Sequence, residues 1–256
     1  MKISTTSLNK KGTIKLWSII FWLLVWQGLS LYIGQEILLA SPLSVLNQLV
    51  HLITGLSFWS SIFFSFQRIV FGFFLATLIG ISFAAFAARF RFIEHLLAPL
   101  ILFVNSTPVA SIIILLIIWF SSQHLATIVS FLMVMPIIYT NILSGIKSTD
   151  VKLLEMAEVF EVPLGRRIIY IYISQVFPFF KAACLVGLGI SWKAGVAAEV
   201  IGITSGSIGS NLHQARIHLA TPDVFAWTFT IIIISALFER IFMFILTLAI
   251  NRLERL

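Results

Sequence analysis

Blocks of apolar residues, separated by short polar segments, run along most of the chain. A helix needs about 20 residues to cross about 30 Å of hydrocarbon. In lipid every backbone N–H and C=O group needs a partner within the protein, so such blocks form helices rather than isolated strands. The sequence therefore predicts an all-α membrane protein, a single transmembrane domain over residues 1–256 with six transmembrane helices. The predicted spans are residues 16–34, 60–88, 96–120, 124–146, 177–201 and 224–248.

Prolines and polar residues mark the places where these spans bend or end. Pro99 and Pro108 fall in the third span and Pro136 in the fourth, and each predicts a kink because proline removes a backbone donor. The short polar segment 121–124 joins the third and fourth spans and predicts an antiparallel helical hairpin. The segment 202–223, which is rich in Gly and Ser, is predicted to be an outer loop.

The composition agrees with a membrane protein and argues against a soluble domain and a nucleic-acid-binding protein. Hydrophobic residues make up 59% of the chain and charged residues 11%, whereas soluble domains have about 45–50% and about 25%. The net charge of +7 does not indicate nucleic acid, because the basic residues lie in short connections between apolar blocks. The first block follows basic residues as in a signal peptide, but it is long enough to span, so an uncleaved helix is predicted.

The basic residues lie almost entirely on one side of the predicted spans. With the N-terminus inside, 13 of the 17 Lys and Arg residues fall in cytoplasmic segments, and only Arg216 falls in an outer loop. The positive-inside rule therefore predicts that both termini face the cytoplasm. The 13 residues are Lys2, Lys10, Lys11, Lys15, Arg89, Arg91, Lys147, Lys152, Arg166, Arg167, Lys181, Arg252 and Arg255.

The longest predicted cytoplasmic connection, residues 150–170, has the pattern of a helix rather than of a linker. Asp150 can cap the first turn, and Pro163 with Gly165 ends the helix. Between them the apolar residues recur at helical spacing, which predicts one apolar stripe. The stripe consists of Leu153, Met156, Ala157 and Phe160. An amphipathic helix of this kind docks in a partner's groove or rests on lipid headgroups, and the pattern alone favours neither.

Several segments resemble one family of transport proteins. Glu155, Met156 and Ala157, with the break that follows, resemble the EAA loop of bacterial ATP-binding-cassette (ABC) importer permeases, a short helix that sits in a cleft of the ATPase subunit. Glu161 stands where that loop has a glycine. Three further segments resemble the start, the second span and the fifth span of nitrate/sulfonate/taurine-type permeases, the binding-protein-dependent transport system inner-membrane components. They are residues 40–46 (ASPLSVL), 65–73 (SFQRIVFGF) and 192–202 (WKAGVAAEVIG).

The resemblance implies a non-catalytic permease subunit of an ABC importer in the bacterial cytoplasmic (inner) membrane. It implies a homodimer with a second permease copy, two cytoplasmic ATPase subunits that bind ATP and Mg²⁺, and an extracytoplasmic solute-binding protein. The implied solute is a sulfonate, nitrate, taurine or related anion, or a heterocycle such as a thiamine precursor. The residues implied to couple to the ATPase are Leu153, Glu155, Met156, Ala157, Phe160, Glu161 and Gly165.

Polar residues inside the predicted spans are candidates for the translocation path, because an ionisable group in lipid is costly unless it is paired or hydrated. The candidates are Arg68, Asn105, Thr107, Lys193 and Glu199. Each also has a structural interpretation. Arg68 and Glu199 can form ion pairs that hold helices together, and polar side chains beside Pro108 can satisfy the carbonyl that this proline leaves unpaired.

The motifs missing from the sequence limit the chemistry of the chain. It has no G-x-x-x-x-G-K-[ST] motif, so it does not hold ATP by that route, and we expect it to bind no cofactor itself. Its five histidines and single cysteine form no metal-binding motif.

An ion-coupled secondary transporter is the alternative function. The spans hold only two carboxylates for a coupling ion, Glu199 and Glu239, and show no inverted repeat.

Overall fold

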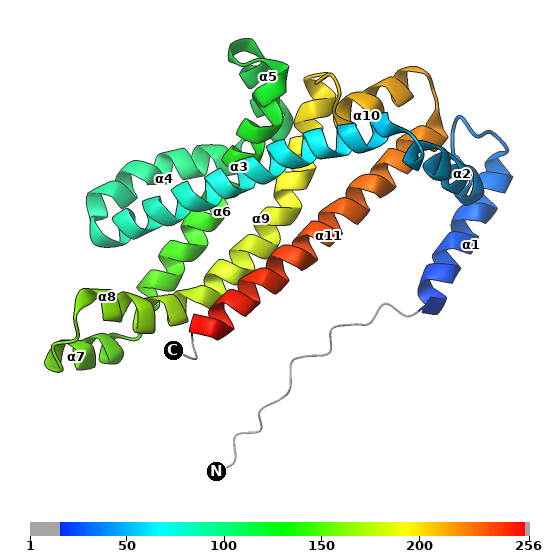
Figure 1. Cartoon of the computed structure of the whole chain (residues 1–256). Helices are drawn as coiled ribbons and strands as arrows, with labels where there is room; N and C mark the ends of the chain where they lie inside the picture. Colours follow the sequence, from blue (N-terminus) through cyan, green and yellow to red (C-terminus); the bar gives the residue numbers. More distant parts are fainter. Residues whose placement is uncertain (1–15, 254–256) are drawn as a thin grey trace.

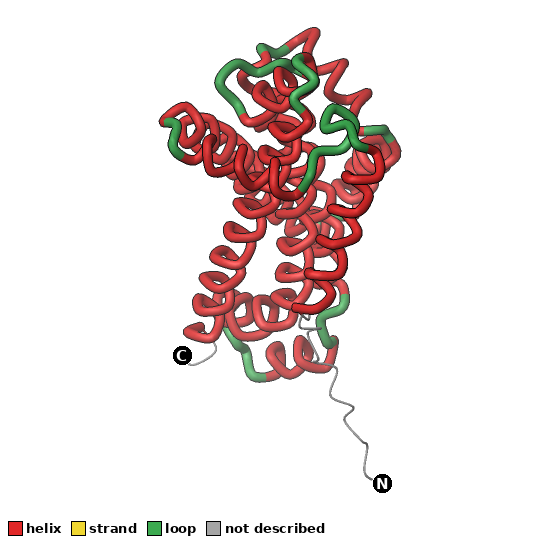
Figure 2. The backbone as a smooth tube through the Cα atoms, turned by 90° about the vertical axis from the view of Figure 1, so that its right-hand side faces the viewer, coloured by secondary structure: helices red, strands yellow, loops and turns green. Residues whose placement is uncertain are grey.

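The computed structural model describes residues 16–253, and every regular element in this part of the chain is helical (Figure 1 and Figure 2). The predicted all-α fold is therefore confirmed. Five basic residues of the predicted cytoplasmic set, Lys2, Lys10, Lys11, Lys15 and Arg255, lie outside the described residues. The elements are α1 (Leu16–Ile33), α2 (Pro42–Ile53), α3 (Leu56–Arg89), α4 (Arg91–Ser106), α5 (Val109–Trp119), α6 (Ser122–Lys147), α7 (Val151–Val159), α8 (Leu164–Arg167), the π-helix η1 (Ile168–Ile173), α9 (Ser174–Ile201), α10 (Ile208–Ile217) and α11 (Thr221–Leu253).

Within the described residues, five helical segments are long and apolar enough to cross a membrane: Leu16–Ile33, Leu56–Arg89, Ser122–Lys147, Leu164–Ile201 and Thr221–Ile250. The third predicted span is divided into α4 and α5, which meet at an angle of 107°, so the spans in this part of the chain number five, or six if this bent pair is counted as one span. The kink expected at Pro108 is thus a sharp break, since Pro108 is the N-terminal cap of α5. Pro99 and Pro136 lie inside α4 and α6, which continue past them.

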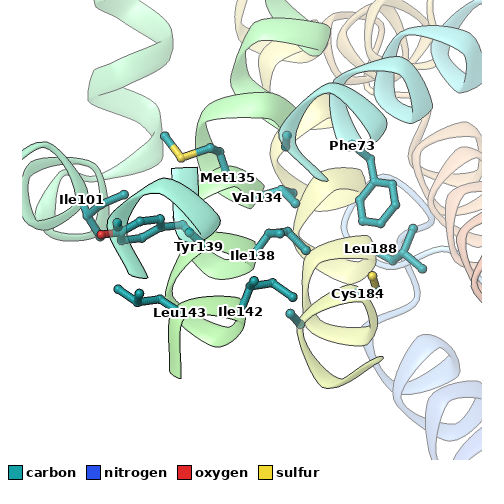
Figure 3. Close-up of a cluster of buried hydrophobic side chains, with 14 residues drawn as sticks. Phe73, Ile101, Val134, Met135, Ile138, Tyr139, Ile142, Leu143, Cys184 and Leu188 are labelled. Atoms are coloured by element: carbon teal, nitrogen blue, oxygen red, sulfur yellow. The ribbon is translucent and has the colours of Figure 1, made fainter. Parts of the chain in front are cut away.

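Helix α6 lies between α3 and α9 and forms the centre of the bundle (Figure 1). Figure 3 shows the largest apolar cluster at this centre, where Phe73 of α3 and Leu188 of α9 are buried with Ile138 of α6. Small residues allow the close approach of these helices. A Cβ atom at Gly72 would lie 2.5 Å from the carbonyl oxygen of Thr127, so only glycine fits the contact between α3 and α6.

The segment 202–223 is not the irregular loop that its composition indicated, because it contains α10. Ser207 caps this helix by accepting a hydrogen bond from the Ser210 N–H at 3.0 Å. The helices α2 and α10 lie at one end of the molecule, and α7 and α8 lie at the other (Figure 1). The two sets of connections between the spans are therefore on opposite sides of the bundle.

A candidate translocation cavity and coupling segment

A cavity of about 440 Å³ lies beside the break between α4 and α5. Its wall also includes residues of α6 and α9. Three of the five predicted path residues, Asn105, Thr107 and Lys193, line this one cavity, although the sequence places Lys193 far from the other two. Lys193 is the only charged residue among the described residues of the lining, and its side chain is exposed.

The broken span adds a second positive feature to the cavity wall. Val109, the first residue of α5, lines the cavity. The first N–H groups of a helix have no partner inside it, and the helix dipole gives this end a partial positive charge. At the neighbouring end of α4, the Thr107 hydroxyl donates to the Phe103 carbonyl at 2.6 Å, so part of the opposing negative end is already bonded. The cavity therefore combines a lysine with the start of a helix.

Glu199 does not line the cavity. It belongs to α9, and its side chain is completely buried against α3 and α10. Its Oε2 atom accepts hydrogen bonds from the Ser65 hydroxyl at 2.8 Å and from the Gly209 N–H at 3.1 Å. The Ser65 hydroxyl oxygen in turn accepts a bond from the Ile208 N–H at 2.9 Å. Glu199 and Ser65 thus bind the first N–H groups of α10, which favours a structural role for this carboxylate as the anchor of the outer helix.

Arg68 is also outside the cavity. Its guanidinium carbon lies 3.5 Å from the centre of the Phe64 ring, an arrangement typical of a cation–π contact. Its Nη1 atom is buried and makes no hydrogen bond with the described residues. Within residues 16–253 the one ion pair joins Lys147 to Glu94. Arg68 and Glu199 therefore do not form an ion pair.

The predicted coupling segment forms α7, a break and α8, as its sequence pattern indicated. The Asp150 side chain caps α7 by accepting from the Lys152 N–H at 2.9 Å. The residues of the predicted apolar stripe, however, do not all face the same way: some are buried and others are exposed. Ala157 is only 1% exposed and packs against its own chain, and Leu153 is half-buried, whereas Met156 and Phe160 are exposed. Val159, which the stripe did not include, is exposed beside them.

Arg167 ties the two short helices of the segment together. Its Nε donates to the Val162 carbonyl at 2.7 Å and its Nη2 to the Ala157 carbonyl at 3.1 Å. Hydrogen bonds from a charged donor are stronger than neutral ones. Glu155 and Gly165 both lie on the exposed side, and a Cβ atom at Gly165 would meet nothing within 4 Å.

The end of α7 explains the glycine that the EAA loop has at the position of Glu161. The Glu161 N–H bonds to the Glu158 carbonyl, and the Val162 N–H bonds to the Ala157 carbonyl. These two bonds make a Schellman motif, whose C′ residue adopts a left-handed conformation. Glu161 has φ 50°, a value that glycine adopts without the steric cost of a Cβ atom.

We expect Glu161→Gly to stabilise this end of α7 by roughly 1 kcal/mol, because it removes the left-handed strain. Hydrogen exchange of the Val162 amide measures the effect and should become slower. Glu158→Gly is the control, because it places glycine inside the same helix at another exposed position and should speed exchange. Faster exchange in Glu161→Gly would contradict this explanation.

Sequence reasoning missed three residues of these sites, Val109, Ser65 and the exposed Val159. Val109 gave a signal, since a helix that starts directly after Pro108 exposes its first N–H groups there. Ser65 gave none, because its partner Glu199 is 134 positions away. Within residues 16–253 no group of three or more His, Cys, Asp or Glu residues is placed to hold a metal ion.

Long apolar helices around a buried core, with a broken helix pair beside a cavity that contains a few polar side chains, are typical of a multi-pass membrane transport protein. Residues 76–255 match the family model described as binding-protein-dependent transport system inner membrane component, and the chain belongs to this family. It is a permease subunit of an ABC importer and a multi-pass protein of the cytoplasmic membrane. Membership favours this function over ion-coupled secondary transport and implies an ATPase and a binding protein as partners.

Three named relatives align with the chain over 54–86% of their own length. The taurine transport system permease protein TauC of Escherichia coli K12 is 25% identical over 239 residues, which cover 91% of this chain and 86% of TauC. The putative aliphatic sulfonates transport permease protein SsuC of Bacillus subtilis 168 is 26% identical over 79% of this chain and 74% of its own. The bicarbonate transport system permease protein CmpB of Synechococcus elongatus is 27% identical over 59% of this chain and 54% of its own.

Proposed function

We propose that two copies of this chain form a path for a small anion across the cytoplasmic membrane. An external binding protein delivers the solute, and two cytoplasmic ATPase subunits supply the energy. One observation supports the choice of an anion: within residues 16–253, Lys193 is the only charged residue that lines the cavity at the α4–α5 break. A cation in a wall of low polarity attracts a negative solute and repels a positive one.

The start of α5 supports the same choice. In membrane transporters the N-termini of broken helices commonly face anionic groups of the substrate. Asn105 and Thr107 add polar side chains to the wall where α4 ends. The solutes in the names of the relatives, sulfonates, taurine and bicarbonate, all carry a negatively charged group. A positively charged heterocycle such as a thiamine precursor fits this lining less well than an oxyanion.

The proposal of a homodimer is supported by the exposure of the cavity wall in the single chain. Asn105 and Lys193 are exposed, and Leu102 and Phe103 beside them on α4 are exposed apolar residues. A solute path in lipid needs protein on all sides, because neither an anion nor an exposed lysine is stable against hydrocarbon. A second copy facing this surface would complete the wall.

Residues 150–170 are the proposed contact with the ATPase. Met156, Val159 and Phe160 present an exposed apolar surface at the end of the molecule opposite α10 (Figure 1). Lys152, Arg166 and Arg167 lie in the same segment, and the positive-inside rule places such segments in the cytoplasm. An amphipathic helix with a few projecting apolar residues suits a groove on a soluble partner.

The test of the proposed path is Lys193→Met, which keeps the length of the side chain and removes its charge. Hydrogen bonds to a charged group contribute about 1.5–3 kcal/mol, so uptake of taurine, an alkanesulfonate or bicarbonate by vesicles that contain the whole transporter should fall by roughly 10- to 150-fold. Lys193→Arg keeps the charge and should retain most of the uptake.

Arg216→Gln is the matched control, because it removes one exposed cation from α10 that does not line the cavity. Its uptake should equal that of the unmodified transporter. Equal uptake by Lys193→Met would refute the proposed anion path, as long as the variant still binds its ATPase subunit.

A further inference from the structure

A second cavity of the molecule is apolar and lies at the end of the bundle that carries α7 and α8. It has a volume of about 400 Å³ and is formed by α3, α6, η1, α9 and α11. Among the described residues of its lining, the one polar side chain is that of Tyr172. The other lining residues include Ile81, Ile142, Ile168, Phe177 and Ile250. These described residues provide no partner for a charged or strongly polar solute, so the pocket suits a hydrocarbon chain.

Basic residues lie close in sequence to the lining residues of this pocket. Arg89 follows Ala85 on α3, Lys147 follows Ile146 on α6, and Arg252 follows Ile250 on α11. Arg166 and Arg167 precede η1, and Lys181 follows Phe180 on α9. Five different elements thus contribute a cation within four positions of a lining residue.

Only some of these cations are engaged by the protein itself. Lys147 pairs with Glu94 at 2.5 Å, and Arg167 donates to two carbonyl groups of the coupling segment. Arg166, Lys181 and Arg252 form no ion pair within residues 16–253. Long basic side chains keep their charge at the membrane surface while their stems pack on apolar atoms. These three cations are therefore suited to meet a phosphate group at the lipid–water boundary.

We propose that this pocket binds an anionic phospholipid of the inner leaflet. One acyl chain occupies the pocket, and the phosphate group meets Arg166, Lys181 and Arg252. Basic pockets between transmembrane helices on the cytoplasmic side are known to select anionic headgroups. The cytoplasmic position of the pocket rests on the orientation in the proposed function, whereas its apolar lining and the basic residues close to it in sequence do not.

The position of η1 connects this lipid with the coupling segment. Ile168, Tyr172 and Ile173 of η1 line the pocket, and η1 is the only link from α8 to α9. Wide helical turns of this type occur often at functional sites. A bound acyl chain packs on η1 from the membrane side, so the lipid supports the junction through which α7 and α8 act on α9.

The experiment uses the whole transporter, purified with its ATPase subunit and titrated with phosphatidylglycerol or phosphatidylcholine. Native mass spectrometry counts the lipids that each complex retains. We expect the unmodified transporter to retain phosphatidylglycerol at lipid concentrations at least roughly tenfold lower than phosphatidylcholine. Ala85→Trp fills the pocket and should abolish this preferential retention. Leu78→Trp is the control, because it adds the same ring to an exposed position of α3 that does not line the pocket.

A second variant tests the headgroup contact without changing the pocket. Replacing Arg166, Lys181 and Arg252 together by glutamine should make the retention of the two lipids equal. Unchanged preference for phosphatidylglycerol in Ala85→Trp or in the triple variant would overturn the proposal, as would equal retention of both lipids by the unmodified transporter. Failure of the unmodified chain to purify with an ATPase would instead count against the proposed function, because lipid retention is read from the permease itself.

Discussion

Phe160→Asp is expected to separate the permease from its ATPase and to abolish transport. Phe160 is 74% exposed at the end of α7, next to the exposed Val159 and Met156. Burying an aromatic side chain of this kind contributes about 1.5–3 kcal/mol to a contact. An aspartate at the centre of an apolar groove adds the cost of burying an unpaired charge. Central anchors of this type account for most of the binding energy of an interface.

Co-purification of the ATPase with the solubilised permease measures this effect, and solute-stimulated ATP hydrolysis measures its functional consequence. Both should be lost in Phe160→Asp. Leu56→Asp is the matched control, since Leu56 is an exposed apolar residue at the start of α3, and it should retain both. Normal co-purification of Phe160→Asp would show that the ATPase docks on another surface.

Gly209→Ala is expected to destabilise the outer side of the molecule strongly. A Cβ atom there would lie 2.3 Å from the Cβ of Glu199 and 2.6 Å from the backbone N of Val200. Because one of these atoms belongs to the backbone of α9, α10 must move away. Such movement lengthens the bonds from the Gly209 N–H to Glu199 and from the Ile208 N–H to Ser65. Overpacking together with the loss of two buried hydrogen bonds costs on the order of 3–5 kcal/mol.

The thermal unfolding midpoint of the detergent-purified protein measures this loss, and proteolysis of the segment 202–220 locates it. Gly189→Ala is the control, because a Cβ at Gly189 on α9 meets nothing within 4 Å. That variant should be neutral or gain up to about 1 kcal/mol. An unchanged midpoint and unchanged proteolysis in Gly209→Ala would mean that α10 is not held through Glu199.

The all-α fold followed from the sequence because burial in lipid imposes one strong requirement, an apolar helix of sufficient length. The break at Pro108 followed from the missing N–H of proline. The position of α10 did not follow, because its Gly- and Ser-rich sequence resembles a loop. Ser207 was the available signal, since serine is a favoured N-terminal cap.

The candidate sites were predicted only in part, for a related reason. Periodicity placed Leu153, Met156, Ala157 and Phe160 on one side of a helix, but it could not show that Ala157 packs on its own chain while Phe160 stays exposed. Polarity identified Lys193 and Glu199 alike as intramembrane ionisable residues. Only the tertiary structure separates them, since it places Lys193 in a cavity and surrounds Glu199 with Ser65 and the Gly209 N–H.

The bonds of Arg167 determine how the inner segment can move. Because its guanidinium holds the carbonyls of Ala157 and Val162, we expect α7 and α8 to move as one unit rather than as two hinged ones. We therefore expect a displacement applied at Phe160 to pass the bend at Pro163 and to reach the π-helix Ile168–Ile173. The deformation of this π-helix would therefore limit how far the movement of α7 and α8 displaces α9.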